Sequence, residues 1–349
     1  MPHSRPTPGS SHTARAALLF IFAGLLFLSG CKTSSKVSVP QLLTPVVEAD
    51  TPRLLEEINR LAAVRSLRGK VDIQFLDTSF AKCGVAEKYK TADGTVTLQR
   101  PGHILLVIQV PFIGTDVAQM TSDGEHFRVA VLQGEERYKR FVKGTNNAVY
   151  PKLEADGAEP DCGDDDNGKK SMNVRAVSAL SSLRPQHVTD ALMVLPVAAP
   201  DSNLIYAQTE SFEEEADTRP KAKKGARVVR AYYMLVELRP EASGRARVLR
   251  RFWFDRVGEL RLARLQTYDD AGRLATDVIY REPKAFGEGS RYNLPSRVEL
   301  TRPQDRYSLR ITYQTPEAVK IDQPYPADVF DLKNSWNLPE VNLDERTRK

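Results

Sequence analysis

The side chains with the clearest chemical potential in this chain are three thiols, at Cys31, Cys83 and Cys162. Cys31 directly follows Leu28-Ser29-Gly30, which closes an apolar run with a basic start. A basic start, a short apolar core and small residues before a cleavage point are typical of a secretory signal peptide, so we predict that residues 1–30 are removed. Cys31 would then be the first residue of the exported chain.

The stretch Leu28-Ser29-Gly30-Cys31 resembles the lipobox of bacterial lipoproteins. The resemblance implies a diacylglyceryl thioether on Cys31, cleavage before it and an acylated new N-terminus, whose palmitate-type chains would anchor the protein to membrane lipid. Lys32 stands where an aspartate would indicate inner-membrane retention, which favours the outer membrane and a domain that faces the periplasm. An ordinary signal peptide followed by an incidental cysteine is the alternative.

The two remaining thiols can pair, because export leads out of the reducing cytoplasm. We predict a disulfide between Cys83 and Cys162, with two separate buried thiols as the alternative. The 50 basic and 45 acidic residues give a modest positive charge that is spread along the chain. This balance argues against a nucleic-acid partner.

The sequence gives little support for a catalytic site. Three histidines remain after signal removal, His103, His126 and His187, and none has the spacing of a zinc-binding helix. No Gly-x-Ser-x-Gly nucleophile motif occurs. Residues 163–170 space glycines and a lysine like a phosphate-binding loop, but carboxylates would face the phosphates, and the aspartates around Cys162 miss the EF-hand register. We therefore expect no enzyme activity, no cofactor and no metal site.

The elements that would position functional groups are mostly strands. After a flexible tether over residues 31–50, Thr51-Pro52 is a good cap and first turn for a helix with apolar residues at helical spacing. From Val71 the apolar period changes to two, which predicts strands. Asp93-Gly94 and Ser122-Asp123-Gly124 predict hairpin turns, because these residues accept the backbone angles of tight turns.

A second helical region interrupts the strands. Pro185 can begin a helix in which Val188, Ala191, Leu192 and Leu195 share one face. Roughly a dozen strands and two helical patches exclude a doubly wound sheet, which needs a helix between most strands. We predict a mainly β (α+β) fold, a highly curved antiparallel sheet or incomplete β-barrel, whose concave face is filled by side chains, a helix or a ligand.

This order of parts resembles the LolA/LolB-like lipoprotein-carrier superfamily over most of residues 53–332. The resemblance implies a leading helix, a helical lid, an apolar cavity for acyl chains and a basic residue inside the cavity that closes the lid; the motifs do not place that residue. The phrases that support it are Ser66-Leu67-Arg68-Gly69, Leu98-Gln99-Arg100-Pro101-Gly102, Ser122-Asp123-Gly124 and Leu294-Pro295-Ser296-Arg297-Val298. The domains expected are a signal peptide (1–30), a tether (31–50), a half-barrel domain (51–335) and a polar C-terminal tail (336–349).

The resemblance also implies sites. Acyl chains would contact apolar residues of the long strand and of the lid, namely Ile104, Leu106, Ile108, Leu192 and Leu195. A membrane-contact loop would present Phe112 and Ile113, unless they fold back into the core. The expected function is a membrane-anchored, periplasm-facing lipoprotein that binds acyl chains of lipids or lipoproteins, with other lipoproteins or a periplasmic carrier as partners. The alternative is a structural or sensory envelope lipoprotein with a packed cavity.

Overall fold

A computed structural model describes residues 39–77, 87–88, 92–134, 136, 139–146, 183–197, 203–289 and 291–346. The chain divides into two units, Met1–Gln41 and Leu42–Lys349, and the second holds nearly all of the described residues. Cys31, Cys83 and Cys162 lie outside the described residues, as does the signal peptide. The lipidation and the disulfide therefore stay predictions.

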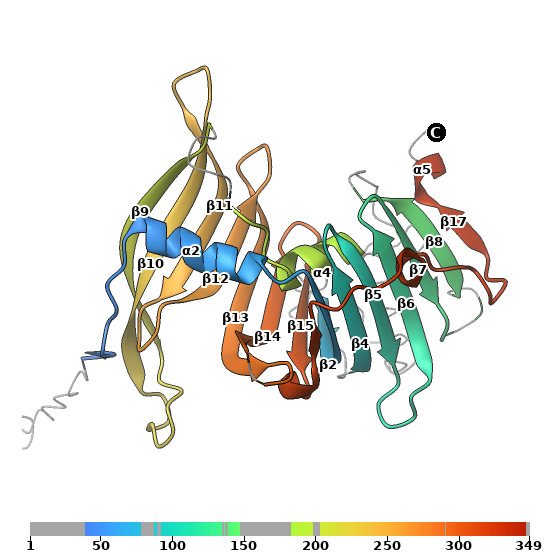
Figure 1. Ribbon diagram of the computed structural model, residues 1–349, viewed down its shortest axis with the longest axis horizontal. Helices are drawn as coiled ribbons and strands as arrows, with labels where there is room; N and C mark the ends of the chain where they lie inside the picture. Colours follow the sequence, from blue (N-terminus) through green and yellow to red (C-terminus); the bar gives the residue numbers. More distant parts are fainter. Residues whose placement is uncertain are drawn as a thin grey trace, which may run out of the picture. The chain divides into compact units, whose positions relative to one another are not determined.

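Most described residues belong to strands of one sheet that curves and does not close (Figure 1). Antiparallel pairing runs in the spatial order β9, β10, β11, β12, β13, β14, β15, β2, β4, β5, β6, β7, β8, and β17 joins β8 in parallel. The mainly β fold class is thus confirmed. The strands are β1 (Gln41–Leu42), β2 (Ser66–Asp77), β3 (Glu87–Lys88), β4 (Ala92–Gln99), β5 (His103–Gln109), β6 (Asp116–Asp123), β7 (His126–Val131), β8 (Arg140–Thr145), β9 (Ile205–Ala216), β10 (Arg227–Pro240), β11 (Ala246–Asp255), β12 (Arg261–Tyr268), β13 (Leu274–Phe286), β14 (Tyr292–Arg302), β15 (Tyr307–Tyr313), β16 (Lys320–Ile321) and β17 (Glu340–Asn342).

Two helices cover one face of this sheet (Figure 1). The N-terminal helix has Asp50 rather than the expected Thr51 as its cap, because the backbone N–H of Arg53 donates to Asp50 Oδ1 at 3.1 Å. Within the described residues, no helix is both long and apolar enough to cross a membrane. The helices are α2 (Thr51–Ala62), α4 (Pro185–Leu192) and α5 (Leu343–Arg346), with 3₁₀ turns η3 (Pro316–Ala318) and η4 (Ala327–Phe330).

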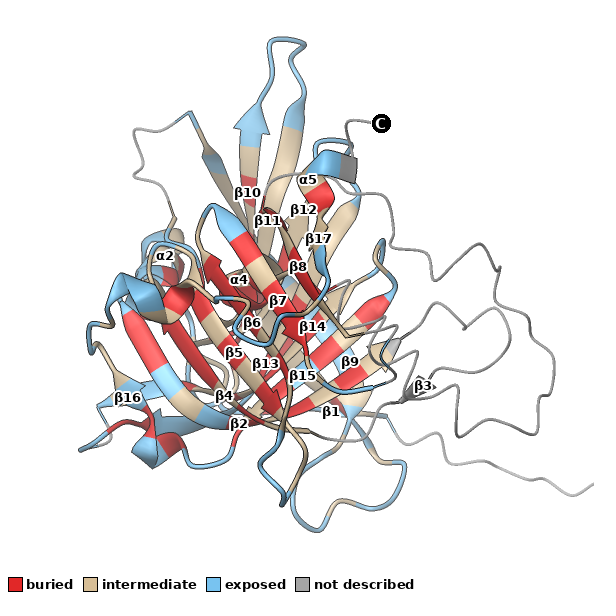
Figure 2. Ribbon diagram, turned by 90° about the vertical axis from the view of Figure 1, so that its right-hand side faces the viewer, coloured by how far each residue is buried: buried red, intermediate tan, exposed pale blue. Residues whose placement is uncertain are grey.

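The core lies between the helices and the sheet. Helix α2 buries Leu54 and Ile58, and strand β5 buries every second residue, so that the red positions alternate with tan ones along the strands (Figure 2). This alternation follows from the period of a strand, in which successive side chains point to opposite faces. In β2 the buried residues Val71, Ile73 and Phe75 are the ones that the period-two pattern of the sequence predicted.

The prediction of a hairpin turn at Asp93-Gly94 was wrong. Both residues lie inside β4, where Gly94 pairs with Val71 of β2 and with Ile108 of β5. A Cβ atom at Gly94 would stand only 2.6 Å from the carbonyl oxygen of Val107. The glycine thus permits a close approach between neighbouring strands, a use of glycine that competes with its use in turns.

Two of the expected domain boundaries also change. Leu43 is buried and its N–H donates to Val229 O at 2.9 Å, and Val46 forms a bridge with Val257, so the end of the expected tether packs on the sheet. At the other end, β17 adds to β8 and Leu343 is buried. Part of the expected polar tail is therefore a strand of the domain. The sequence did not indicate this strand, because an alternation over three residues is too short to detect.

Candidate functional site

The lid segment, residues 185–197, consists of α4 and the five residues after it. Helix α4 contacts β5, β6 and β14 and buries Val188 and Ala191 against them. The predicted shared face extends too far, because the helix ends at Leu192 and Leu195 is 49% exposed. Leu192 is partly buried and packs against the core.

Arg100 fastens the lid segment to the end of α2. It follows β4 directly, and its Nε donates to Val64 O at 2.9 Å while its Nη2 donates to Val194 O at 2.8 Å. Burial lowers the pKa of Arg100 from its ordinary value, but the residue remains a cation at neutral pH. One planar guanidinium therefore holds together two backbone segments that lie far apart in the sequence.

Three further side chains hold the lid segment in place. Arg250 of β11 donates to Leu195 O and Pro196 O, both at 3.1 Å, and its guanidinium also pairs with the buried Glu237. Asn59 of α2 accepts from the N–H of Val197 at 3.2 Å. The hydroxyl of Tyr280, on β13, donates to Ala191 O at 3.1 Å and so satisfies a carbonyl in the last turn of α4.

Helix α4 itself carries two titratable side chains, His187 and Asp190. The ring of His187 contacts the hydroxyl of Tyr307 at 2.9 Å, and burial, assisted by the charge of Arg302, lowers the pKa of His187 to about 3. Burial raises the pKa of the Asp190 carboxyl to about 6, although Arg302 opposes the shift. At neutral pH His187 is uncharged and Asp190 is ionised, so the helix carries one partly buried charge.

The space between the lid segment, α2 and the sheet, here called the inner space, is almost filled. Its volume is about 30 Å³, and apolar side chains including Leu192, Val194 and Phe286 line it. Of the predicted acyl-chain contacts, only Leu192 lines it. The strand residues among them, which are Ile104, Leu106 and Ile108, are buried in the core under α4.

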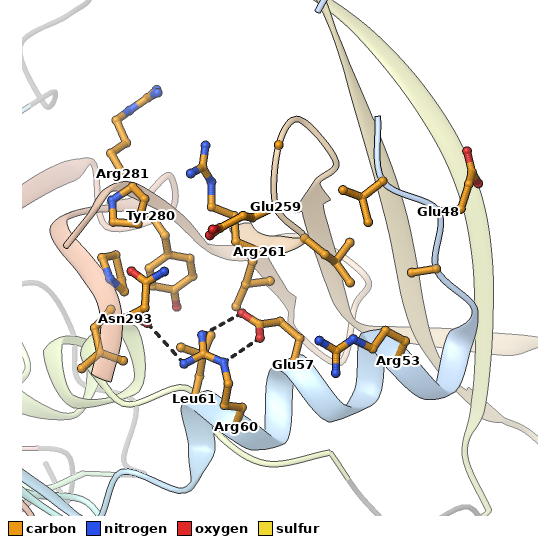
Figure 3. Close-up of a pocket in the computed structure, with 18 of the residues that line it drawn as sticks. Glu48, Arg53, Glu57, Arg60, Leu61, Glu259, Arg261, Tyr280, Arg281 and Asn293 are labelled. Atoms are coloured by element: carbon orange, nitrogen blue, oxygen red, sulfur yellow. Dashed lines mark hydrogen bonds and ion pairs between the residues drawn. The ribbon is translucent and has the colours of Figure 1, made fainter. Parts of the chain in front are cut away.

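A larger cavity, here called the groove, opens beside the inner space (Figure 3). Its volume is about 540 Å³, and it lies between α2, residues 47–49 and the strands β12 to β14. Arg53, Glu57 and Arg60 reach it from α2, and Arg261 faces them from β12 (Figure 3). Both oxygens of Glu57 accept hydrogen bonds from Arg60, at 2.7 and 2.9 Å, and hydrogen bonding to Glu57 raises the pKa of Arg60.

The loop between β5 and β6 presents two large apolar side chains to solvent. Phe112 is fully exposed and Ile113 is 74% exposed, so neither folds back into the core. Phe112 also has a φ of 66°, a region that costs a residue with a Cβ roughly 1–2 kcal/mol. Neither the exposure nor the backbone angle stabilises the fold, which marks this loop as a candidate contact surface.

No protein-family model matches the sequence, and no curated protein matches it. Several crystal structures are similar to this chain, among them the following three. A LolA superfamily protein from Nitrosomonas europaea is 11% identical, with a TM-score of 0.39, over 82% of this chain and 99% of that one. A putative outer membrane lipoprotein-sorting protein domain from Vibrio parahaemolyticus is 11% identical, with a TM-score of 0.40, over 80% and 95%. A DUF1329 family protein from Desulfovibrio piger is 10% identical, with a TM-score of 0.38, over 81% and 96%.

The sequence did not reveal Arg100 and Arg250, which fasten the lid segment, nor the arginines that line the groove. Arg100 belongs to one of the sequence motifs that support the resemblance, so the motif indicated this stretch of the chain but not the role of Arg100. Its acceptors are main-chain carbonyl oxygens, which every residue type has, so the sequence does not identify them. No group of three or more His, Cys, Asp or Glu residues in the described part of the chain could hold a metal ion.

Proposed function

We propose that this chain is a membrane-anchored lipoprotein that faces the periplasm and binds acyl chains of lipids or lipoproteins beneath its lid segment. It would serve lipid or lipoprotein trafficking at the outer membrane, with other lipoproteins or a periplasmic carrier as partners. The observation that carries the proposal is the pair of hydrogen bonds by which Arg100 joins the lid segment to the end of α2. A short helix that is fastened in this way over an apolar sheet face is a cover that can open.

The free energies of closing the lid and of binding a chain are of the same order. Hydrogen bonds contribute about 1 kcal/mol each, and those from charged groups about 1.5–3 kcal/mol. Arg100, Arg250, Asn59 and Tyr280 make the contacts that would have to break. An acyl chain that buries about ten methylenes gains roughly 8 kcal/mol before ordering costs, so its burial can offset opening of the lid.

The exposed pair Phe112 and Ile113 supports a second part of the proposal, contact with a membrane surface. An apolar tip would act in addition to the lipid anchor and would hold the domain against the bilayer during transfer. Each large apolar side chain that leaves water contributes about 1.5–3 kcal/mol, which is useful only as an addition to an anchor.

The small volume of the inner space favours the alternative, a structural or sensory envelope lipoprotein whose concave face is packed by its own side chains. About 30 Å³ gives room for roughly two water molecules rather than for an acyl chain. In that case the lid segment stays closed, and the apolar residues of β5 serve only as core.

Titration of the full chain with a fluorescent fatty acid separates the two candidates. Leu192→Asp places a carboxylate beside the inner space, and Leu195→Asp makes the same change at an exposed position just after α4. We expect saturable binding by the wild-type chain and by Leu195→Asp. Leu192→Asp should bind at least about tenfold more weakly, because a charge facing a chain is costly, while its thermal melt stays cooperative. No saturable binding by the wild-type chain, with unfolding of Leu192→Asp, would favour the scaffold.

A further inference from the structure

The groove and the inner space share an apolar wall. Leu61 at the end of α2, Tyr280 on β13, and Leu294 and Pro295 on β14 line both cavities. A chain-like ligand that entered the inner space across this wall would leave its head in the groove. The groove, at about 540 Å³, lies within the range of roughly 300–1,000 Å³ that small-molecule sites occupy.

The lining of the groove carries more positive than negative side chains, namely five arginines and three glutamates. Two of the glutamates are already bound by the protein. Glu57 accepts both of its hydrogen bonds from Arg60, and Glu48 accepts from Arg256 at 2.5 Å. Glu259 is the one acid of the lining without an ion pair, as far as the described residues extend.

Two arginines of the lining share their carboxylate with a second arginine. The Nη2 atom of Arg261 lies 2.7 Å from an oxygen of Asp255, and Arg230 lies 2.9 Å from the same oxygen. Arg281 stands 3.7 Å from Glu299, a carboxylate that another arginine contacts at 3.0 Å. Such shared partners leave part of the positive charge of Arg261 and Arg281 for an external anion.

We propose that the groove binds the anionic head of an acyl amphiphile, a phosphate ester whose chain crosses the shared wall into the inner space. The inference rests on the proposed function and adds the class of the head group and its place. Arg281 and Arg291 are the side chains assigned to the phosphate. Arg291 is exposed and, in the described part of the chain, has no ion pair, and the guanidinium fork matches the oxygens of a phosphate.

Equilibrium dialysis of the full chain, with the same non-ionic detergent in both chambers, tests this inference. The probes are dihexanoyl phosphatidic acid, dihexanoylglycerol and inorganic phosphate, which separate head from chain. We expect the phosphatidic acid to bind about tenfold more tightly than the diacylglycerol, because two charge contacts at exposed positions are individually weak. Inorganic phosphate should bind more weakly than the phosphatidic acid, because it lacks the chain.

Matched double variants locate the effect. Arg281→Gln with Arg291→Gln should lower the affinity for phosphatidic acid to that for the diacylglycerol. Arg219→Gln with Arg273→Gln removes the same charge from exposed arginines outside the groove lining, whose carboxylate partners do not contact the groove arginines, and should change the affinity less than about twofold. Unfolding is checked by the melting temperature, and affinity for the diacylglycerol must stay unchanged in both.

Each other outcome overturns the inference in a distinguishable way. Equal, saturable binding of the two lipids removes the head-group site and leaves acyl-chain binding intact. Binding of inorganic phosphate as tight as that of phosphatidic acid would assign the groove to a free anion. No binding of either lipid contradicts the head-group site and the proposed function together.

Discussion

Arg100 is the residue on which the closed state of the lid segment depends most directly. Its guanidinium donates to Val64 O and Val194 O, which belong to the segments that follow α2 and α4. Both acceptors are main-chain oxygens that would lose a partner if the side chain were removed. The cost of an unsatisfied buried acceptor exceeds the net value of the bond itself.

Replacement of Arg100 by Leu should lower the free energy of unfolding by about 1–3 kcal/mol and should loosen the lid segment. Hydrogen exchange of the full chain, followed by mass spectrometry, should be faster over residues 185–197 in the variant than in the wild-type chain. Exchange in β5 should stay the same in both. Arg65→Leu, at a nearby exposed arginine, serves as the control and should leave both quantities unchanged. Unchanged exchange over residues 185–197 in Arg100→Leu would contradict the fastening role.

The Phe112 and Ile113 pair gives a second prediction at this scale. In a chain that carries Cys31→Ser, Phe112→Ser with Ile113→Ser should weaken binding to phospholipid vesicles by about tenfold or more, because apolar area no longer enters the lipid. Stability should change by less than about 0.5 kcal/mol, since both side chains are exposed. Phe212→Ser with Ile205→Ser removes the same residue types from exposed positions on β9 and is the control. An equal loss in the control would contradict a specific contact loop.

The sequence reveals some of these residues better than others. Phe112 and Ile113 were predicted from the family resemblance, which implies an apolar tip on this loop, and the structure shows that both side chains are exposed. Arg100 could not be assigned, since its partners lie 36 and 94 residues away and any residue type can supply a carbonyl oxygen. Arg250 escaped notice for the same reason.

At the scale of elements, the strands were predictable where their faces differ in polarity. Strand β2 alternates apolar and polar residues and buries Val71, Ile73 and Phe75, and the turn at Gly124 needs a glycine because its φ is 96°. Asp93-Gly94 carries the same type of signal but lies inside β4, where the carbonyl oxygen of Val107 leaves no room for a Cβ atom. A glycine that permits close packing and one that forms a turn look alike in sequence.

Asp190 and His187 make the stability of α4 depend on pH in opposite senses. The pKa of Asp190 is raised to about 6, so its stabilising contribution is present below about pH 4 and is lost as the pH rises through 6. The pKa of His187 is lowered to about 3, so its contribution is present above about pH 6.5 and is lost as the pH falls toward 3. The two effects partly cancel between pH 4 and pH 6.

Asp190→Asn should expose this balance. The variant should be more stable than the wild-type chain by about 1–3 kcal/mol at pH 7.5, because the amide needs no buried charge, and the difference should vanish near pH 4. Urea denaturation at several pH values measures it. A difference that stays constant from pH 4 to pH 7.5 would show that Asp190 does not titrate as described.

At the scale of the whole molecule, the lipobox residues predict where the protein acts. Cys31→Ser should abolish acylation and release the full chain from membranes, since a single apolar loop cannot replace two acyl chains. Mass spectrometry of the N-terminal peptide and fractionation after an alkaline wash check the two halves of this expectation. Retention of the variant in the washed membrane fraction would contradict the anchor.

The fold class was predictable from the sequence because strand periodicity and the scarcity of helical patches restrict the architecture strongly. The extent of the domain was not. Leu43 packs on the sheet and β17 lengthens it, although both lie in segments whose composition is that of a tether or a tail. Such short additions are held by pairing with a preformed sheet edge or face, and a local pattern cannot report a partner that lies far along the chain.

Acyl-chain binding beneath the lid segment is the central claim, and native mass spectrometry of the full chain extracted from its own membranes tests it most directly. The wild-type chain and the exposed control Leu195→Asp should carry a co-purified acyl lipid. Leu192→Asp should appear largely without it, because the carboxylate would face the chain in the inner space. A wild-type protein that carries no lipid beyond its covalent anchor, or a lipid that Leu192→Asp retains to the same extent, would contradict the claim.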